Sequence, residues 1–147
     1  MRNICKKTAK FAKNVIHIFY MKTFTVEKTP RTPLIHFDFE KGTFEISGTS
    51  IPEDADVFYA SALEHFERFL NHKLTNPIKL IFKFVYFNTS TSNYIISFLK
   101  LIKAKAPKQY YTVEWHYEQE DEDMLETGKH FEAVMEIPFK FQEVELF

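Results

Sequence analysis

The chain has 147 residues, of which 45% are hydrophobic and 17% aromatic, enough for one domain with a packed core. Residues 1–20 carry five basic and no acidic side chains, which leaves 14 basic against 20 acidic side chains, a formal charge of −6, on residues 21–147. A nucleic-acid binder normally presents a basic surface on its folded part, so this distribution argues against nucleic acid as a partner.

Residues 1–20 have the charge of a targeting segment but lack its other features. The apolar run at residues 15–21 is interrupted by His17, has no small-residue cleavage site after it, and is too short to span a membrane. We therefore expect a basic extension outside the fold, with Met21 as a candidate start and residues 21–147 as one regulatory domain. An amphipathic surface anchor is the alternative. The single cysteine, Cys5, lies in this extension, so neither a disulfide nor a thiol metal cluster is predicted, which is consistent with a cytoplasmic protein.

Two strands and a helix are predicted first in the folded part. The strands cover residues 34–39 and 43–48, and a hairpin connection joins them in which Gly42 can take a positive φ. Ser50 as a cap candidate, followed by Pro52 and acidic residues, predicts a helix that runs to about Leu70. Its expected core-facing residues are Phe58, Ala62, His65, Phe66 and Phe69.

Residues 78–102 are predicted to form a strand that turns directly into a helix. The strand ends at Asn88, and it is expected to be central because both of its faces become apolar toward that end. Alternation assigns Tyr86 to the same face as Phe84, and Phe87 to the opposite face. The helix is expected to lie on the sheet through residues at helical spacing, namely Ile95, Phe98, Leu99, Ile102 and Ala106.

The remaining elements are a strand at residues 110–117, an acidic run at residues 118–123, a helix and a last edge strand. The helix is expected to pack through Met124, Leu125, Gly128, Phe131 and Met135, and Pro138 ends it before the strand that contains Phe139 and Val144. The order ββαβαβαβ indicates an α/β fold with a single mixed β-sheet and packed helices. In such folds the loops at the carboxyl ends of the strands form the functional edge, which here contains residues 88–93 and the acidic run.

Enzyme signatures are weak. The three glycines cannot form a phosphate-binding loop, the six histidines form no metal-binding array, and Ser90 and Ser92 lack the surroundings of a nucleophilic serine. We therefore predict a protein without catalytic residues, metal or cofactor. Two alternatives stay open: a small-molecule-binding domain that uses the apolar space near residue 88, and a metal-assisted hydrolase that uses His116 and the acidic run.

Five consecutive polar residues, 88–92, lie where the central strand becomes a helix. A helix cap explains one of them. A phosphate placed here would meet free backbone N–H groups and the positive end of the helix dipole, so the fold would tolerate it and the effect would fall on a partner. The candidate partner-binding residues are Asn88, Thr89, Ser90, Thr91 and Asn93.

Several short motifs occur together in one order along the chain. They are Phe37-Asp38, Gly42, Ser47-Gly48, Pro52-Glu53, Tyr86-Phe87-Asn88-Thr89-Ser90, Trp115-His116-Tyr117 and Pro138-Phe139. With these motifs the chain resembles the SiaC family of bacterial biofilm-regulating phosphoproteins over about residues 23–143. That family in turn resembles the STAS-like anti-sigma-factor antagonists, which place a phosphorylatable hydroxyl at the start of the helix after a central strand.

The resemblance implies a phosphorylation switch rather than an enzyme. The matching phosphorylated residue is Thr89, with Ser90, Thr91 and Ser92 as fallback sites. It further implies that a histidine-kinase-like ATPase phosphorylates this residue, that a PP2C-type phosphatase reverses the modification, and that the unmodified protein binds and activates a diguanylate cyclase in cyclic di-GMP signalling. ATP would belong to the kinase. The chain departs from the family pattern in its basic extension and at Ile51 and Thr91, where an aromatic residue and a serine are expected.

Overall fold

Six strands form one mixed sheet in the computed structural model, which describes residues 21–147. The strands lie side by side in chain order: β1 (Thr23–Val26), β2 (Leu34–Asp38), β3 (Thr43–Ser50), β4 (Ile78–Phe87), β5 (Tyr111–Glu118) and β6 (Phe139–Val144). The pairs β1–β2 and β2–β3 are antiparallel, whereas β3 to β6 are parallel. The expectations for residues 1–20 lie outside the described residues.

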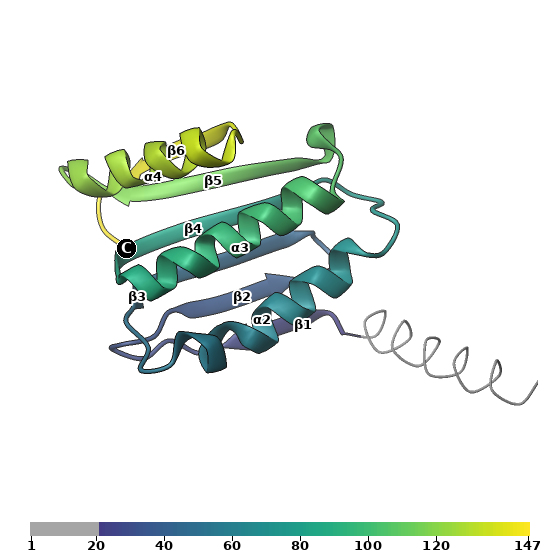
Figure 1. Cartoon of the computed structure of the whole chain (residues 1–147), viewed down its shortest axis with the longest axis horizontal. Coiled ribbons are helices and arrows are strands. Elements are labelled where there is room, and N and C mark those ends of the chain that lie inside the picture. Colours follow the sequence, from purple (N-terminus) through teal and green to yellow (C-terminus); the bar gives the residue numbers. More distant parts are fainter. Residues whose placement is uncertain (1–20) are drawn as a thin grey trace, which may run out of the picture.

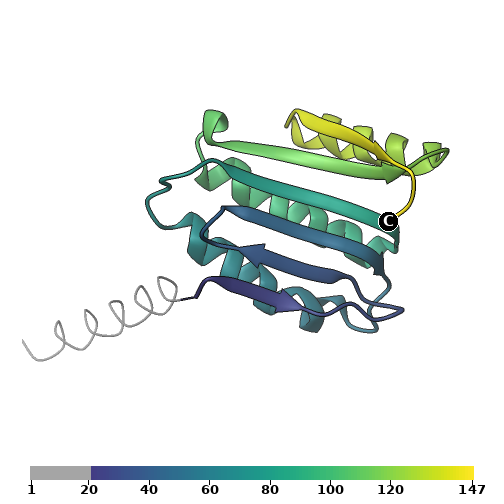
Figure 2. The ribbon, with the colours of Figure 1, turned by 180° about the vertical axis from the view of Figure 1, so that it is seen from behind.

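Three helices connect the parallel strands: α2 (Ala55–Leu70), α3 (Thr89–Lys105) and α4 (Glu122–Met135), with a short 3-10 helix, Lys108–Tyr110, before β5. All three α-helices lie on the same face of the sheet (Figure 1), and Figure 2 shows the opposite face without a helix over it. None of the helices within residues 21–147 is long and apolar enough to cross a membrane. The predicted fold class, a single mixed sheet with packed helices, is confirmed.

The core lies between the sheet and the helices and is rich in aromatic side chains. Residues that alternate along the strands face the helices and are fully buried, among them Phe37, Phe44, Phe82, Phe84 and Trp115. The residues predicted to pack α3 on the sheet are all buried, namely Ile95, Phe98, Leu99, Ile102 and Ala106. Gly42 has a φ of +67°, as the predicted hairpin connection requires.

The predicted element order omits a strand. The described residues begin with β1, so that their order is βββαβαβαβ rather than ββαβαβαβ. Within the four residues of β1 only Phe24 and Val26 are apolar, too short a pattern to predict a strand. Phe24 nevertheless packs: its ring stacks on His65 at 4.3 Å between centroids and lies 5.8 Å from Phe37.

The end of β4 also differs from the prediction. Its central position is confirmed, but the pairing with β3 shifts between Gly48 and Thr49, because β4 contains an extra residue there. This β-bulge moves the alternation by one position. The exposed fractions of Val85 and Tyr86 are therefore 42% and 57%, and Phe87 turns toward the helices, with its ring 5.0 Å from that of Phe84. The assignments of Tyr86 to the face of Phe84 and of Phe87 to the opposite face are both wrong for this reason.

Candidate functional site at the β4–α3 junction

The junction lies at the carboxyl end of β4, where α2 and α3 both begin (Figure 1). A hydrogen bond from the Tyr94 hydroxyl to the Asp56 carboxylate joins the first turns of the two helices, and the Tyr94 ring stacks on Tyr59 with centroids 4.8 Å apart. The bond to Asp56 raises the pKa of Tyr94 to about 12, so Tyr94 keeps its proton near neutral pH. The two helix starts are thus held together beside the junction.

Asn88 caps α3, which confirms that one of the polar residues in this run serves as a cap. Its backbone is extended, with φ −92° and ψ 174°, and its Oδ1 accepts a hydrogen bond from the Thr91 backbone N–H at 3.1 Å. The same oxygen accepts bonds from two hydroxyls, Ser90 Oγ at 2.8 Å and Thr91 Oγ1 at 3.0 Å. Three donors therefore converge on one amide oxygen.

Thr91 belongs to a buried group of hydroxyls beneath the junction. Thr91, Ser50 and Tyr59 are all essentially inaccessible to solvent. Ser50 Oγ lies 2.8 Å from Thr91 Oγ1 and 2.6 Å from the Tyr59 hydroxyl, so the group links α3, the end of β3 and α2. Burial raises the pKa of Tyr59 to about 12 against the opposing effect of its hydrogen bonds to Ser50 and Thr91, so Tyr59 remains a hydrogen-bond donor.

The predicted site residues occupy different environments. Thr89 is the first residue of α3 and is exposed, and no side chain within residues 21–147 bonds its hydroxyl. Asn93 is also exposed, whereas Ser90 and Ser92 are half-buried. Thr91, considered above as both a fallback phosphorylation site and a contact residue, is fully buried, so a partner cannot reach its hydroxyl in this conformation.

Ser50 and Tyr59 were missed as parts of the site. Ser50 was expected to cap α2, but it ends β3, and Asp54 is the cap, with its Oδ1 3.1 Å from the Val57 N–H. Tyr59 was absent from the predicted packing face of α2. The spacing of Ala55, Tyr59 and Ala62 would have placed Tyr59 on the buried face.

The acidic run at residues 118–123 lies at the same edge of the sheet, but its residues form the turn into α4 and the cap of that helix. Asp121 caps α4, with its Oδ1 3.0 Å from the Met124 N–H, and Glu120 takes a positive φ of 70° in the turn. His116 pairs with Glu114 at 3.1 Å. Within the part of the chain that the structure describes, no group of three or more His, Cys, Asp or Glu residues could hold a metal ion. The residues of the hydrolase alternative are therefore not brought together.

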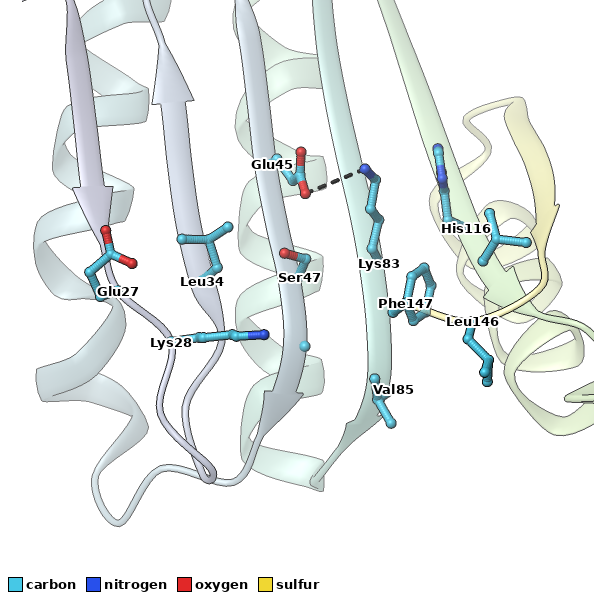
Figure 3. Close-up of a pocket in the computed structure, with 12 residues that line it drawn as sticks. Glu27, Lys28, Leu34, Glu45, Ser47, Lys83, Val85, His116, Leu146 and Phe147 are labelled. Carbon is cyan, nitrogen blue, oxygen red and sulfur yellow. Dashed lines mark ion pairs between the residues drawn. The ribbon is translucent and has the colours of Figure 1, made fainter.

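The face of the sheet without helices contains an open hollow of about 510 Å³ (Figure 3). Strands β2 to β5 form its floor, and Leu146 and Phe147 of the C-terminal segment border it. Its lining is mixed: Val85 is apolar, whereas Glu45 and Lys83 form an ion pair of 3.4 Å. Val85 lies three residues before Asn88 in the chain, but none of residues 88–93 lines this hollow.

Comparisons with known proteins agree with the resemblance. A family model described as SiaC family regulatory phosphoprotein matches residues 26–144. An uncharacterized protein of Pseudomonas aeruginosa strain UCBPP-PA14 is 27% identical over 123 residues, which cover 83% of this chain and 97% of that protein.

Two solved structures resemble the whole described fold. The crystal structure of apo-SiaC from Pseudomonas aeruginosa matches with a TM-score of 0.73 at 25% identity, over 83% of this chain and 99% of that one. The crystal structure of the diguanylate cyclase SiaD in complex with its activator SiaC, from the same organism, matches with a TM-score of 0.76 at 25% identity, over 82% of this chain and 99% of that one.

Proposed function

The chain belongs to the SiaC family of regulatory phosphoproteins, and on that basis we propose that it is a non-enzymatic switch controlled by phosphorylation of Thr89. The observation that carries this proposal is the position of Thr89 at the first residue of α3, exposed beside the cap Asn88. A phosphate on Thr89 would lie near the positive end of the α3 dipole, so the fold should tolerate it.

The proposed output is a diguanylate cyclase. A similar protein, SiaC of Pseudomonas aeruginosa, is the activator of the diguanylate cyclase SiaD in their crystal structure. We infer that the unmodified chain binds and activates a cyclase of this kind. The proposed modifying enzymes are a histidine-kinase-like ATPase and a PP2C-type phosphatase, and because such a kinase uses ATP, the switch is expected to act in the cytoplasm.

The charge of the junction supports release of the partner on phosphorylation. Residues 86–99 contain no Lys, Arg, Asp or Glu. Tyr86, the first of them, and the preceding Val85 are both exposed. The charge nearest to this segment is the Asp56 carboxylate, which accepts a hydrogen bond from Tyr94, so a partner that covers this segment would bury a phosphate of nearly two negative charges without a cation from residues 86–99 to pair it. An unpaired buried charge is costly, so the modified protein should bind more weakly.

The test uses the cognate kinase, ATP and a purified cyclase partner. One phosphoryl group should be added to the wild-type protein and none to Thr89→Ala, which should bind the cyclase as the wild type does. Phosphorylated protein and Thr89→Glu should bind more weakly, the carboxylate less so because it has less charge than a phosphate. The matched control is Thr75→Glu, which introduces the same charge at an exposed threonine before β4, at the opposite edge of the sheet. If an active kinase modifies no site and the cyclase binds every variant equally, the switch hypothesis is wrong.

The hollow on the uncovered face favours a second candidate function, the binding of a small molecule. Its volume of about 510 Å³ is in the range of ligand pockets, and it combines apolar residues with the ion pair between Glu45 and Lys83. Native mass spectrometry of purified protein would detect a retained ligand. A ligand lost in Val85→Asp but kept in Thr89→Ala would support this second function, and its absence under native conditions would count against it.

A further inference from the structure

We propose that Asn88 determines which hydroxyl is phosphorylated, by holding the hydroxyls of Ser90 and Thr91 and leaving that of Thr89 free. The inference rests on the proposed phosphorylation of Thr89. It concerns a different property, the selection of Thr89 over the neighbouring hydroxyls of Ser90 and Thr91.

Residues 89–92 offer a kinase four hydroxyl groups of similar chemistry within one turn of helix. The acceptor hydroxyl must give up its proton as it attacks the phosphoryl group, so a hydroxyl that donates to a protein oxygen first has to break that bond. Ser90 Oγ donates to Asn88 Oδ1 at 2.8 Å, and Thr91 Oγ1 lies 3.0 Å from the same oxygen. Thr89 has no such bond within the described residues and is exposed. Ser92 has none there either, so Asn88 discriminates against Ser90 and Thr91 and not against Ser92.

A chain of buried hydroxyls holds Asn88 in this role. One set of proton positions satisfies every member: Tyr59 donates to Ser50 Oγ at 2.6 Å, and Ser50 donates to Thr91 Oγ1 at 2.8 Å. Thr91 then donates to Asn88 Oδ1 at 3.0 Å, the nearer of its two acceptors, the other being the Ser50 carbonyl oxygen at 3.2 Å. The backbone N–H of Asn88 also donates to the carbonyl of Ser50 at 3.1 Å. Asn88 is therefore fixed from both its side chain and its backbone, and its amide oxygen faces the hydroxyls that it holds.

The burial of Ser90 and Thr91 indicates which of them the kinase would modify if Asn88 lost its side chain. Without Oδ1 of Asn88, the half-buried Ser90 would have a free hydroxyl next to Thr89 in the chain. Thr91 would stay fully buried and bonded to Ser50. Removal of the Asn88 side chain should therefore expose Ser90, and not Thr91, to the kinase.

The experiment maps the phosphorylated residue by tandem mass spectrometry after a time course with the cognate kinase and ATP. Wild-type protein should be labelled at Thr89. In Asn88→Ala the share of label at Ser90 should rise by roughly threefold to tenfold, the effect expected from loss of one hydrogen bond. Asn88→Asp keeps an acceptor oxygen at this position and should restore the wild-type pattern. Asn88→Gly removes the same side chain with little loss of capping, so it gives the result even if the alanine variant is unstable.

Two further variants separate site selection from a general effect of a lost cap. Asp54→Ala removes the cap of α2 without touching residues 88–92, and its label should stay at Thr89. Tyr59→Phe removes the first donor of the buried chain and should raise the Ser90 share less than Asn88→Ala does. No rise in Tyr59→Phe would overturn the part assigned to the buried chain.

The outcomes distinguish this inference from the proposed function. A wild-type protein labelled at Thr89, with Asn88→Ala and Asn88→Gly labelled at Thr89 alone, would overturn the role of Asn88 and leave the switch intact. Label on Ser90 in the wild-type protein would also overturn the inference. A wild-type protein that an active kinase does not label at all would contradict the proposed function itself.

Discussion

Glu114 is a buried carboxylate on β5 that pairs with Lys79 and His116 on the face of the sheet without helices. Lys79 Nζ lies 3.1 Å from its Oε2, and His116 Nε2 lies 3.1 Å from its Oε1. Burial by itself raises the pKa of the Glu114 carboxyl, but the hydrogen bond with His116 and the ion pair with Lys79 together hold it below its ordinary value. The group is therefore ionised when folded, with a partner on each oxygen.

The pKa shift of Glu114 predicts a pH-dependent contribution to stability. Because the folded pKa lies below the unfolded one, the contribution is complete above the ordinary carboxyl pKa of 4.5 and is lost as the pH falls through the folded pKa. Glu114→Gln should lower the free energy of unfolding at pH 7 by about 1 kcal/mol, since Lys79 is half-exposed and the pair is partly screened. The difference from wild type should shrink below pH 4.5.

Urea denaturation at several pH values measures both quantities. The control is Glu126→Gln, which removes an exposed ion pair of 2.9 Å with Lys129 on α4 and should change stability by less than about 0.5 kcal/mol. A destabilisation by Glu114→Gln that stays constant from pH 7 to acid would show that the charge of Glu114 is not its cause.

At the scale of elements, α4 approaches β5 through a glycine. A Cβ on Gly128 would lie 2.5 Å from Cδ1 of Trp115, closer than side chains approach one another. Trp115 cannot easily move away, because its ring is buried, its Nε1–H donates to the Met124 carbonyl at 3.0 Å, and it stacks near Phe139. Gly128 was predicted to lie on the packing face of this helix, and its burial confirms that prediction.

Gly128→Ala should therefore destabilise the protein by about 1–3 kcal/mol, through overpacking against Trp115. Helix propensity acts in the opposite direction, since Ala is favoured over Gly by about 1 kcal/mol within a helix. Ala133→Gly, at an exposed position of α4, is the matched control and should cost about 1 kcal/mol from propensity alone. Chemical denaturation gives both values, and a more stable Gly128→Ala would contradict close packing at this position.

Periodicity predicted the elements whose packing face repeats over several turns or residues. The face of α3 through Phe98 and the central place of β4 follow from such local patterns. That one of residues 88–92 caps α3 was also predicted, although not which one. Features that depend on distant pairing were missed. β1 needs the neighbouring β2, and the shift that turns Phe87 inward needs the register with β3.

The same limit applies to the candidate site. The polar run and its position at a strand end could be predicted, because both are contiguous in the sequence. The burial of Thr91 could not, because it depends on Ser50, which is 41 residues away in the chain, and on Tyr59 of α2. The position of Thr89 at the start of α3 was therefore predictable, whereas the hydrogen bonds that distinguish Ser90 and Thr91 from Thr89 were not.

The two faces of the sheet differ from each other, and residues 1–20 differ in charge from residues 21–147. The described helices cover one face of the sheet and none of them covers the other (Figure 2). The uncovered face carries ion pairs and the hollow beside the C-terminal segment. Along the chain, residues 1–20 are basic and residues 21–147 are acidic. The family model matches within the second part, at residues 26–144, and the described residues form a hydrophobic core of their own.

Residues 1–20 are therefore proposed to be dispensable for folding. A protein that starts at Met21 should unfold at the same temperature as the full chain, because β1 and its contacts are retained. The control starts at Glu27 and lacks β1, so it loses the stacking of Phe24 on His65 and its packing near Phe37. This control should be less stable by about 1–3 kcal/mol, since an aromatic side chain leaves the edge of the core.

Thermal unfolding by circular dichroism compares the three proteins. A loss of 1 kcal/mol shifts the midpoint by roughly 4 °C in a domain of this size, so the control should melt clearly below the other two. Equal melting of the full chain and the Met21 protein, together with the drop in the control, would place the boundary of the folding unit between the basic segment and β1. A drop of similar size in the Met21 protein would instead mean that residues 1–20 contribute to stability, and the hypothesis of an extension outside the fold would be wrong.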